Sequence, residues 1–173
     1  VPATNKPYHD ALRMGVEIYH SLKKILIYRN AIHSVGDEGG FAPNLLTNME
    51  ALEMVDEGIR ETSYKFGVDV FLGLDVAASY FKKEKGYQIK DRPQALTTKE
   101  FIEYYKEIHA KHRLLLLEDA LEEDDWQGWT DLTQELGKEV LIIGDDLLAT
   151  NVQRLTRAIE EKACSAILAK PNQ

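Results

Sequence analysis

The chain has 173 residues, enough for one domain with a buried core, and its 44% hydrophobic and 29% charged residues are typical of a soluble protein. A formal net charge of −8 argues against the basic surface that nucleic acids require, so we expect no nucleic-acid partner. Cys164 is the single cysteine, which excludes an internal disulfide and indicates a reducing compartment, and no apolar stretch reaches the ~20 residues of a membrane span.

Two amphipathic helices separated by a loop are predicted in the first sixty residues. Apolar residues with a helical period define the first helix: Leu12, Val16, Tyr19, Leu22 and Leu26. Residues 31–47 contain three glycines and Pro43 and predict a loop. Thr47 and Glu50 have the spacing of a capping box, so we expect the second helix to begin there.

From residue 68 onward, short apolar strands alternate with amphipathic helices. The predicted strands are 68–75, 114–118, 140–145 and 166–170. The helices between them are expected to begin at Thr97, at Asp124 or Asp125, and near Val152, and residues 79–95 predict a polar hairpin excursion. This order predicts an α/β fold with a parallel sheet covered by helices, and both an open doubly wound sheet and a closed barrel fit it.

Each predicted strand ends in an ionisable residue, in the order Asp75, Glu118, Asp145 and Lys170. In a parallel sheet these ends lie at one edge, and a (β/α)₈ barrel gathers them into the mouth that carries its active site. A charged residue can also end a strand simply because the chain meets water there. Three converging carboxylates repel one another unless a cation compensates, and oxygen ligands with room for water favour Mg²⁺ over zinc.

Lys170 is the candidate reactive group at this edge. A neighbouring divalent cation favours the neutral amine, which can remove a proton from carbon while the metal stabilises the resulting enediolate. The competing interpretation is that Lys170 forms a structural salt bridge with one of the carboxylates.

The loop at residues 36–44 reads GDEGGFAPN, and its glycines permit a close approach of backbone to a ligand. With the preceding valine, the string VGDEGGFAPN resembles the corresponding loop of the enolase family. Other segments resemble successive enolase segments in the same order: ALRMGVEIYHSLKKIL, GLDVAAS, LEDALEEDDWQGW, IIGDDLLATN and ILAKPNQ. The resemblance covers essentially the whole chain.

The resemblance implies a partial enolase-type (β/α)₈ TIM barrel with parallel strands inside and helices outside. Residues 1–173 would be part of the C-terminal catalytic barrel domain, without the N-terminal capping domain and the last barrel strands. The implied function is a Mg²⁺-dependent lyase, phosphopyruvate hydratase, which interconverts 2-phosphoglycerate and phosphoenolpyruvate plus water in glycolysis and gluconeogenesis. The family also implies a homodimer or higher homo-oligomer in the cytoplasm, with display on the cell surface in some members.

The resemblance also implies the roles of individual residues. Asp75, Glu118 and Asp145 match the Mg²⁺ ligands, and Glu118 and Asp145 also lie against the substrate. Lys170 matches the base that takes the C2 proton, and Glu38 matches the acid that assists departure of the C3 hydroxyl.

Two other functions stay open at this point. The chain starts without Met and stops after an apolar run, so we expect a piece of a longer protein that is inactive alone, or an enolase-like protein with a surface-binding or scaffold role. A related racemase or cycloisomerase would share the acidic residues, but it should lack the glycine-rich loop.

Overall fold

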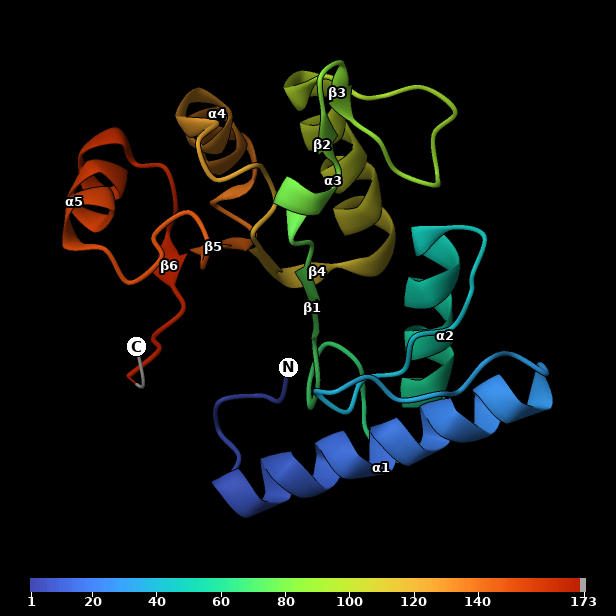
Figure 1. Cartoon of the computed structure of the whole chain (residues 1–173). Helices are drawn as coiled ribbons and strands as arrows, with labels where there is room; N and C mark the ends of the chain where they lie inside the picture. The colour runs from blue at the N-terminus through green and yellow to red at the C-terminus, as the bar shows by residue number, and fades with distance from the viewer. Residues whose placement is uncertain (172–173) are drawn as a thin grey trace. The chain divides into compact units, whose positions relative to one another are not determined.

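The computed structural model describes residues 1–171 and divides into two compact units, Val1–Phe71 and Leu72–Gln173 (Figure 1). The last two residues of the ILAKPNQ segment lie outside the described part of the chain.

The first unit contains the two predicted helices, α1 (Tyr8–Tyr28) and α2 (Asn48–Arg60). As the sequence predicts, the Thr47 hydroxyl caps α2 by accepting a hydrogen bond from the Glu50 N–H at 3.1 Å. The two helices pack closely where α2 carries Gly58, because a Cβ at that position would lie 3.5 Å from the Leu22 Cβ.

The buried side of α1 differs from the predicted stripe. Leu12 and Val16 of that stripe are 54% and 46% exposed, whereas Leu26 is buried as predicted. Met14 and Ile25, which lie outside the predicted stripe, are also buried. Periodicity therefore identified the helix. It could not show which apolar residues of α1 are covered by α2 and by neighbouring segments of the same unit.

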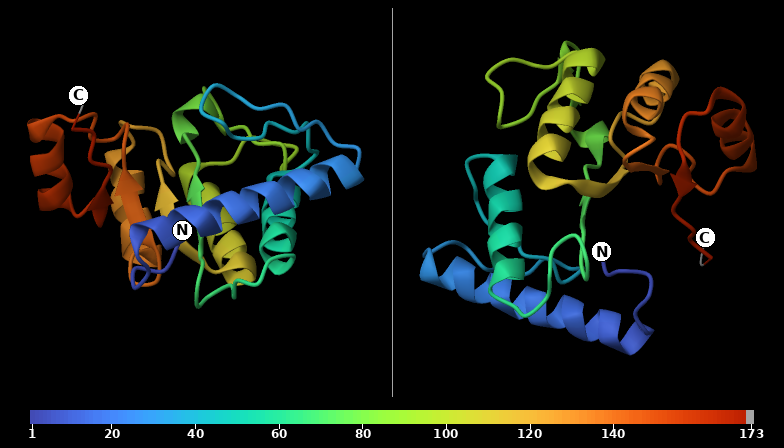
Figure 2. Two further views of the ribbon diagram at one scale, coloured as in Figure 1. Left: turned by 90° about the horizontal axis from the view of Figure 1, so that it is seen from below. Right: turned by 180° about the vertical axis from the view of Figure 1, so that it is seen from behind.

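The second unit is built on a parallel sheet, as predicted. Among the described residues this sheet has four strands in the order β1-β4-β5-β6: Leu72–Asp75, Leu114–Glu118, Leu141–Gly144 and Ala166–Ile167. The chain passes between them through α3 (Thr98–His112), α4 (Trp126–Leu136) and α5 (Val152–Glu161). Figures 1 and 2 show these helices on the same side of the sheet. This succession of strand–helix–strand units is the architecture of a partial barrel.

One strand, 114–118, has the predicted bounds, and the other three are shorter than predicted, most of all at 68–75 and 166–170. Residues 65–70 form a turn rather than strand, in which the Asp69 N–H donates to the Lys65 carbonyl at 2.8 Å. Gly67 takes a φ of +79° in this turn, a conformation that glycine adopts without steric cost. The predicted strand 68–75 was therefore too long, because its first residues belong to a tight turn.

Local signals placed the helix starts and the hairpin correctly. Thr97 and Glu100 form both hydrogen bonds of a capping box at α3, and the Asp125 carboxylate caps α4. The excursion contains the short helix η1 (Ala78–Tyr80) and the hairpin of β2 (Lys82–Lys83) and β3 (Gly86–Tyr87). Gly86 has a φ of +128°, and a Cβ there would lie 2.2 Å from the Leu96 carbonyl oxygen, so only glycine fits.

The core of the second unit lies between the sheet and its helices. Leu117 of β4 is in line with Ile142 of β5, and both side chains are fully buried, together with Trp129 of α4. Because side chains alternate along a strand, the neighbouring residue Glu118 points to the opposite face of the sheet.

Among the described residues, no helix combines the length and the apolar character that a membrane span requires.

Candidate functional site

The predicted acidic residues lie at the carboxyl edge of the sheet. Asp75 is the register partner of Glu118, so their side chains leave the same face of neighbouring strands. Glu118 is in turn the partner of Ile143, and Asp145 follows Ile143 by two positions. Strand alternation therefore favours the same face for all three carboxylates, opposite to the face that the helices cover.

Lys170 contacts one of these carboxylates directly. Its Nζ lies 2.7 Å from Asp145 Oδ1, and the two side chains are 30% and 20% exposed. The hydrogen bond to Asp145 raises the pKa of Lys170 above its usual value. The structure therefore shows an ion pair between Lys170 and Asp145, in line with the competing interpretation, and a neutral Lys170 beside a cation stays a prediction.

Glu118 has the electrostatic environment expected of a crowded acidic site. Burial raises the pKa of Glu118, and the nearby charges of Asp75, Asp119 and Asp145 raise it further, while Lys170 lowers it. These carboxylates are thus close enough to disfavour simultaneous ionisation. A divalent cation would relieve that repulsion, and a set of carboxylate oxygens is the donor chemistry that Mg²⁺ prefers.

Asp119 is a buried acidic residue at this edge of the sheet that sequence reasoning missed. It is 5% exposed and has a φ of 44°, a left-handed conformation that aspartate tolerates better than most residues. Its two carboxylate oxygens accept hydrogen bonds from the N–H groups of Asp145 and Asp146, both at 2.9 Å. Asp119 therefore fixes the backbone at the point where the chain leaves β5, which is where Asp145 stands.

The acidic group with the shortest mutual distances differs from the predicted set. Within residues 1–171, carboxylate oxygens of Asp119, Asp145 and Asp146 lie within 4.8 Å of one another and could hold a metal ion. This group shares only Asp145 with the predicted ligands. Because both oxygens of Asp119 already accept backbone N–H groups, its geometry supports holding the loop rather than primary coordination. The assignment of Asp75 and Glu118 as ligands stays a prediction.

Glu38 lies in the first unit, on the loop between α1 and α2. The loop turns back on itself between Gly36 and Gly40, with hydrogen bonds of 2.9 Å from the Gly36 N–H to the Gly40 carbonyl and from the Gly39 N–H to the Gly36 carbonyl. Gly39 has a φ of +86° there, which explains the need for glycine. Glu38 is exposed at the tip of this turn, and its role as an acid stays a prediction.

Comparison with known proteins decides the family. The family described as "Enolase, C-terminal TIM barrel domain" matches residues 1–173. The chain belongs to this enolase family. It is 44% identical over 174 residues to the enolases of Helicobacter pylori (strain G27) and Helicobacter acinonychis (strain Sheeba), and each alignment covers 100% of the chain and 41% of the relative.

Family membership confirms the predicted partial barrel of the enolase type. The chain spans about two fifths of the length of the curated enolases that it matches. The matched part includes the strand ends described above. The larger part of each relative's length is left unmatched.

Proposed function

We propose that this enolase-family chain supplies the metal ligands, the base and the acid of a lyase that interconverts 2-phosphoglycerate and phosphoenolpyruvate. The observation that carries the proposal is the meeting of Lys170 with Asp145 at the carboxyl edge of a parallel sheet, beside the crowded Glu118. We also propose that residues 1–173 are part of a C-terminal catalytic barrel domain, completed elsewhere by a capping domain and further strands.

The proposed ligands of Mg²⁺ are Asp75, Glu118 and Asp145, which three neighbouring strands bring to one edge. The bound cation would supply positive charge that stabilises the negative charge building up on the substrate carboxylate. Lys170 would take the proton from C2 at its Nζ, and this step requires the amine to leave its ion pair with Asp145 as the neutral base. Glu38 would then protonate the C3 hydroxyl, which departs as water while the C2–C3 double bond forms.

The family supports three further proposals about the complete protein, namely a cytoplasmic location, a homodimer or higher homo-oligomer, and a role in glycolysis and gluconeogenesis. The short coverage of the relatives favours a second candidate for the chain by itself, which is a catalytically incomplete piece.

One experiment tests both candidates. A chimera in which residues 1–173 replace the matching segment of the Helicobacter pylori enolase is expected to form phosphoenolpyruvate, because the missing parts of the barrel are then present. The chain alone is expected to form none. Product is measured by the ultraviolet absorbance of the enol double bond, and circular dichroism verifies that the chimera is folded. A folded chimera without activity would overturn the proposed function, and turnover by the chain alone would overturn its incompleteness.

A further inference from the structure

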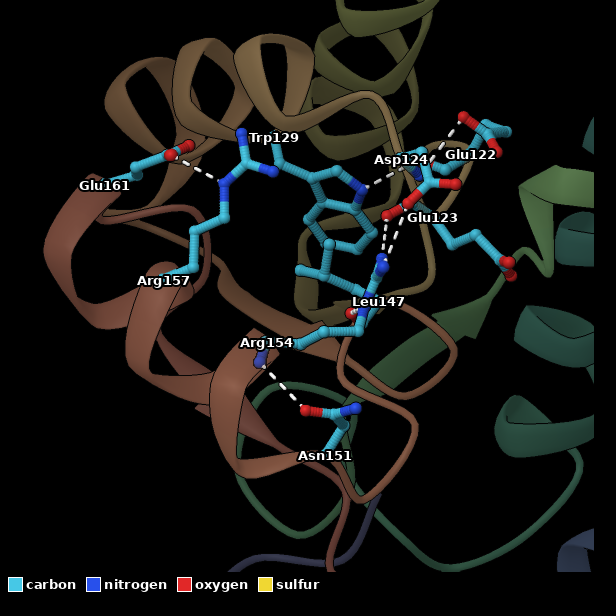
Figure 3. Close-up of polar contacts among 9 residues, drawn as sticks. All are labelled: Glu122, Glu123, Asp124, Trp129, Leu147, Asn151, Arg154, Arg157 and Glu161. Atoms are coloured by element: carbon cyan, nitrogen blue, oxygen red, sulfur yellow. Dashed lines mark hydrogen bonds and ion pairs between the residues drawn. The ribbon is translucent and has the colours of Figure 1, made fainter.

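The guanidinium group of Arg154, on α5, joins two loops of the second unit (Figure 3). Its Nη1 contacts Asp124 Oδ1 at 2.9 Å, and its Nη2 donates to the Glu123 carbonyl oxygen. Its Nε donates to the Leu147 carbonyl oxygen. All three nitrogen atoms of one planar group are therefore used, and the side chain is only 27% exposed.

The two loops are the ones that leave the strands carrying the proposed ligands. Glu123 and Asp124 belong to the segment that follows Glu118 at the end of β4. Leu147 belongs to the turn that follows Asp145 at the end of β5, where the Asp145 carbonyl accepts the N–H of Leu148 at 3.0 Å. Arg154 thus bridges the carboxyl ends of two adjacent strands from outside the acidic group.

The position of Arg154 is itself well defined. The Asn151 side chain caps α5 and accepts a hydrogen bond from the Arg154 N–H at 3.2 Å. The guanidinium carbon lies 5.0 Å from the centre of the Trp126 ring, within the range of a cation–π contact. The indole N–H of Trp129 donates to the Glu122 carbonyl at 3.1 Å and so contacts the first of the two loops.

We propose that Arg154 is a positioning residue that sets the spacing between the Glu118 and Asp145 carboxylates by tying together the loops that follow them. The part of this inference that concerns metal affinity rests on the proposed function. Arginine suits the task because its fixed fork of donors reaches three acceptors at once, whereas a lysine ammonium cannot span them in the same geometry.

Arg157 provides a matched control on the same helix. Its guanidinium carbon lies 4.2 Å from the Trp126 ring centre, and its Nε donates to Glu161 of α5 at 2.7 Å. Replacing Arg157 by alanine removes one positive charge and one cation–π contact, as does Arg154→Ala. The hydrogen bonds to the two loops are removed only in Arg154→Ala.

Hydrogen exchange and metal binding test the inference on the 173-residue chain and on three variants, Arg154→Ala, Arg154→Lys and Arg157→Ala. Exchange is followed by mass spectrometry on peptides that cover residues 119–125 and 144–150. Mn²⁺ affinity is measured by calorimetric titration at a temperature at which circular dichroism shows each variant to be folded.

We expect Arg154→Ala to speed exchange in both peptides and to weaken Mn²⁺ binding by about 10- to 100-fold, the range found for groups that orient metal ligands. Arg154→Lys should recover part of both losses, and Arg157→Ala should change neither.

Each outcome decides a separate question. Unchanged exchange in both loops of Arg154→Ala overturns the inference. A lower melting temperature with unchanged Mn²⁺ affinity also overturns it, because that result is what a purely structural arginine would give. Absence of Mn²⁺ binding by the unaltered chain overturns the proposed metal site, and in that case the exchange data still decide whether Arg154 holds the two loops.

Discussion

Replacing Lys170 by alanine in the chimera is expected to lower phosphoenolpyruvate formation by about 10²- to 10⁴-fold, the contribution typical of a positioned general base. The reason is that its Nζ is the one amine that the second unit brings against Asp145 at the edge of the sheet, as far as the described residues show. The loss should fall on kcat, since the proton transfer occurs after substrate binding. Initial rates over a range of 2-phosphoglycerate concentrations measure it.

The matched control is Lys138→Ala, which removes an exposed lysine that follows α4. It should leave the rate of the chimera unchanged. Equal losses in both variants would show that the effect of Lys170 is not local to the acidic group, and full activity of Lys170→Ala would remove Lys170 from the mechanism.

Replacing Trp129 by alanine should destabilise the 173-residue chain by about 3–5 kcal/mol, as is typical of a large aromatic side chain lost from a core. Trp129 is fully buried between α4 and the sheet, and its indole N–H bonds the Glu122 carbonyl. The change therefore leaves a cavity and removes the indole hydrogen bond, while the Glu122 carbonyl keeps the N–H of Asp125 at 3.1 Å. Urea unfolding followed by far-ultraviolet circular dichroism measures the free energy of unfolding.

A comparison with Ile159→Ala separates burial from hydrophobicity. Ile159 is an apolar residue of α5 that is 69% exposed, so its removal should change the free energy of unfolding by no more than about 0.5 kcal/mol. If Trp129→Ala cost no more than this control, the packing described for the second unit would be wrong.

Much of the second unit follows from local signals in the sequence. Each apolar run with a capping residue after it became a strand followed by a helix, because burial on both faces and satisfied helix ends leave few alternatives. The charged residues at the strand ends could be placed at one edge because the carboxyl ends of parallel strands lie together; they are Asp75, Glu118 and Asp145. In a parallel sheet, residues at a regular spacing in the sequence thus come close together in space.

The sequence could not reveal interactions that depend on the three-dimensional course of the loops. Asp119 follows Glu118 directly and nothing in the sequence sets it apart, but its left-handed backbone turns the carboxylate towards two N–H groups of the next loop. Arg154 lies in the helix predicted near Val152, but only the fold brings its donors to Glu123 and Leu147. In α1, the exposure of Leu12 likewise depends on which neighbours cover the helix.

We propose that acidic side chains at the sheet edge hold one divalent cation, with Asp145 as a ligand. Calorimetric titration of the 173-residue chain with Mg²⁺ and Mn²⁺, repeated on Asp145→Asn and Asp146→Asn, tests it most directly. We expect one bound ion and a loss of at least about 100-fold in affinity for Asp145→Asn, because a direct ligand should contribute more than the ~10- to 100-fold of groups that only support one. Asp146→Asn removes a carboxylate that is neither a proposed ligand nor a proposed support, so its loss should stay below the lower end of that range, about tenfold. Equal affinities of the unaltered chain and Asp145→Asn, or a larger loss in Asp146→Asn, would contradict the account.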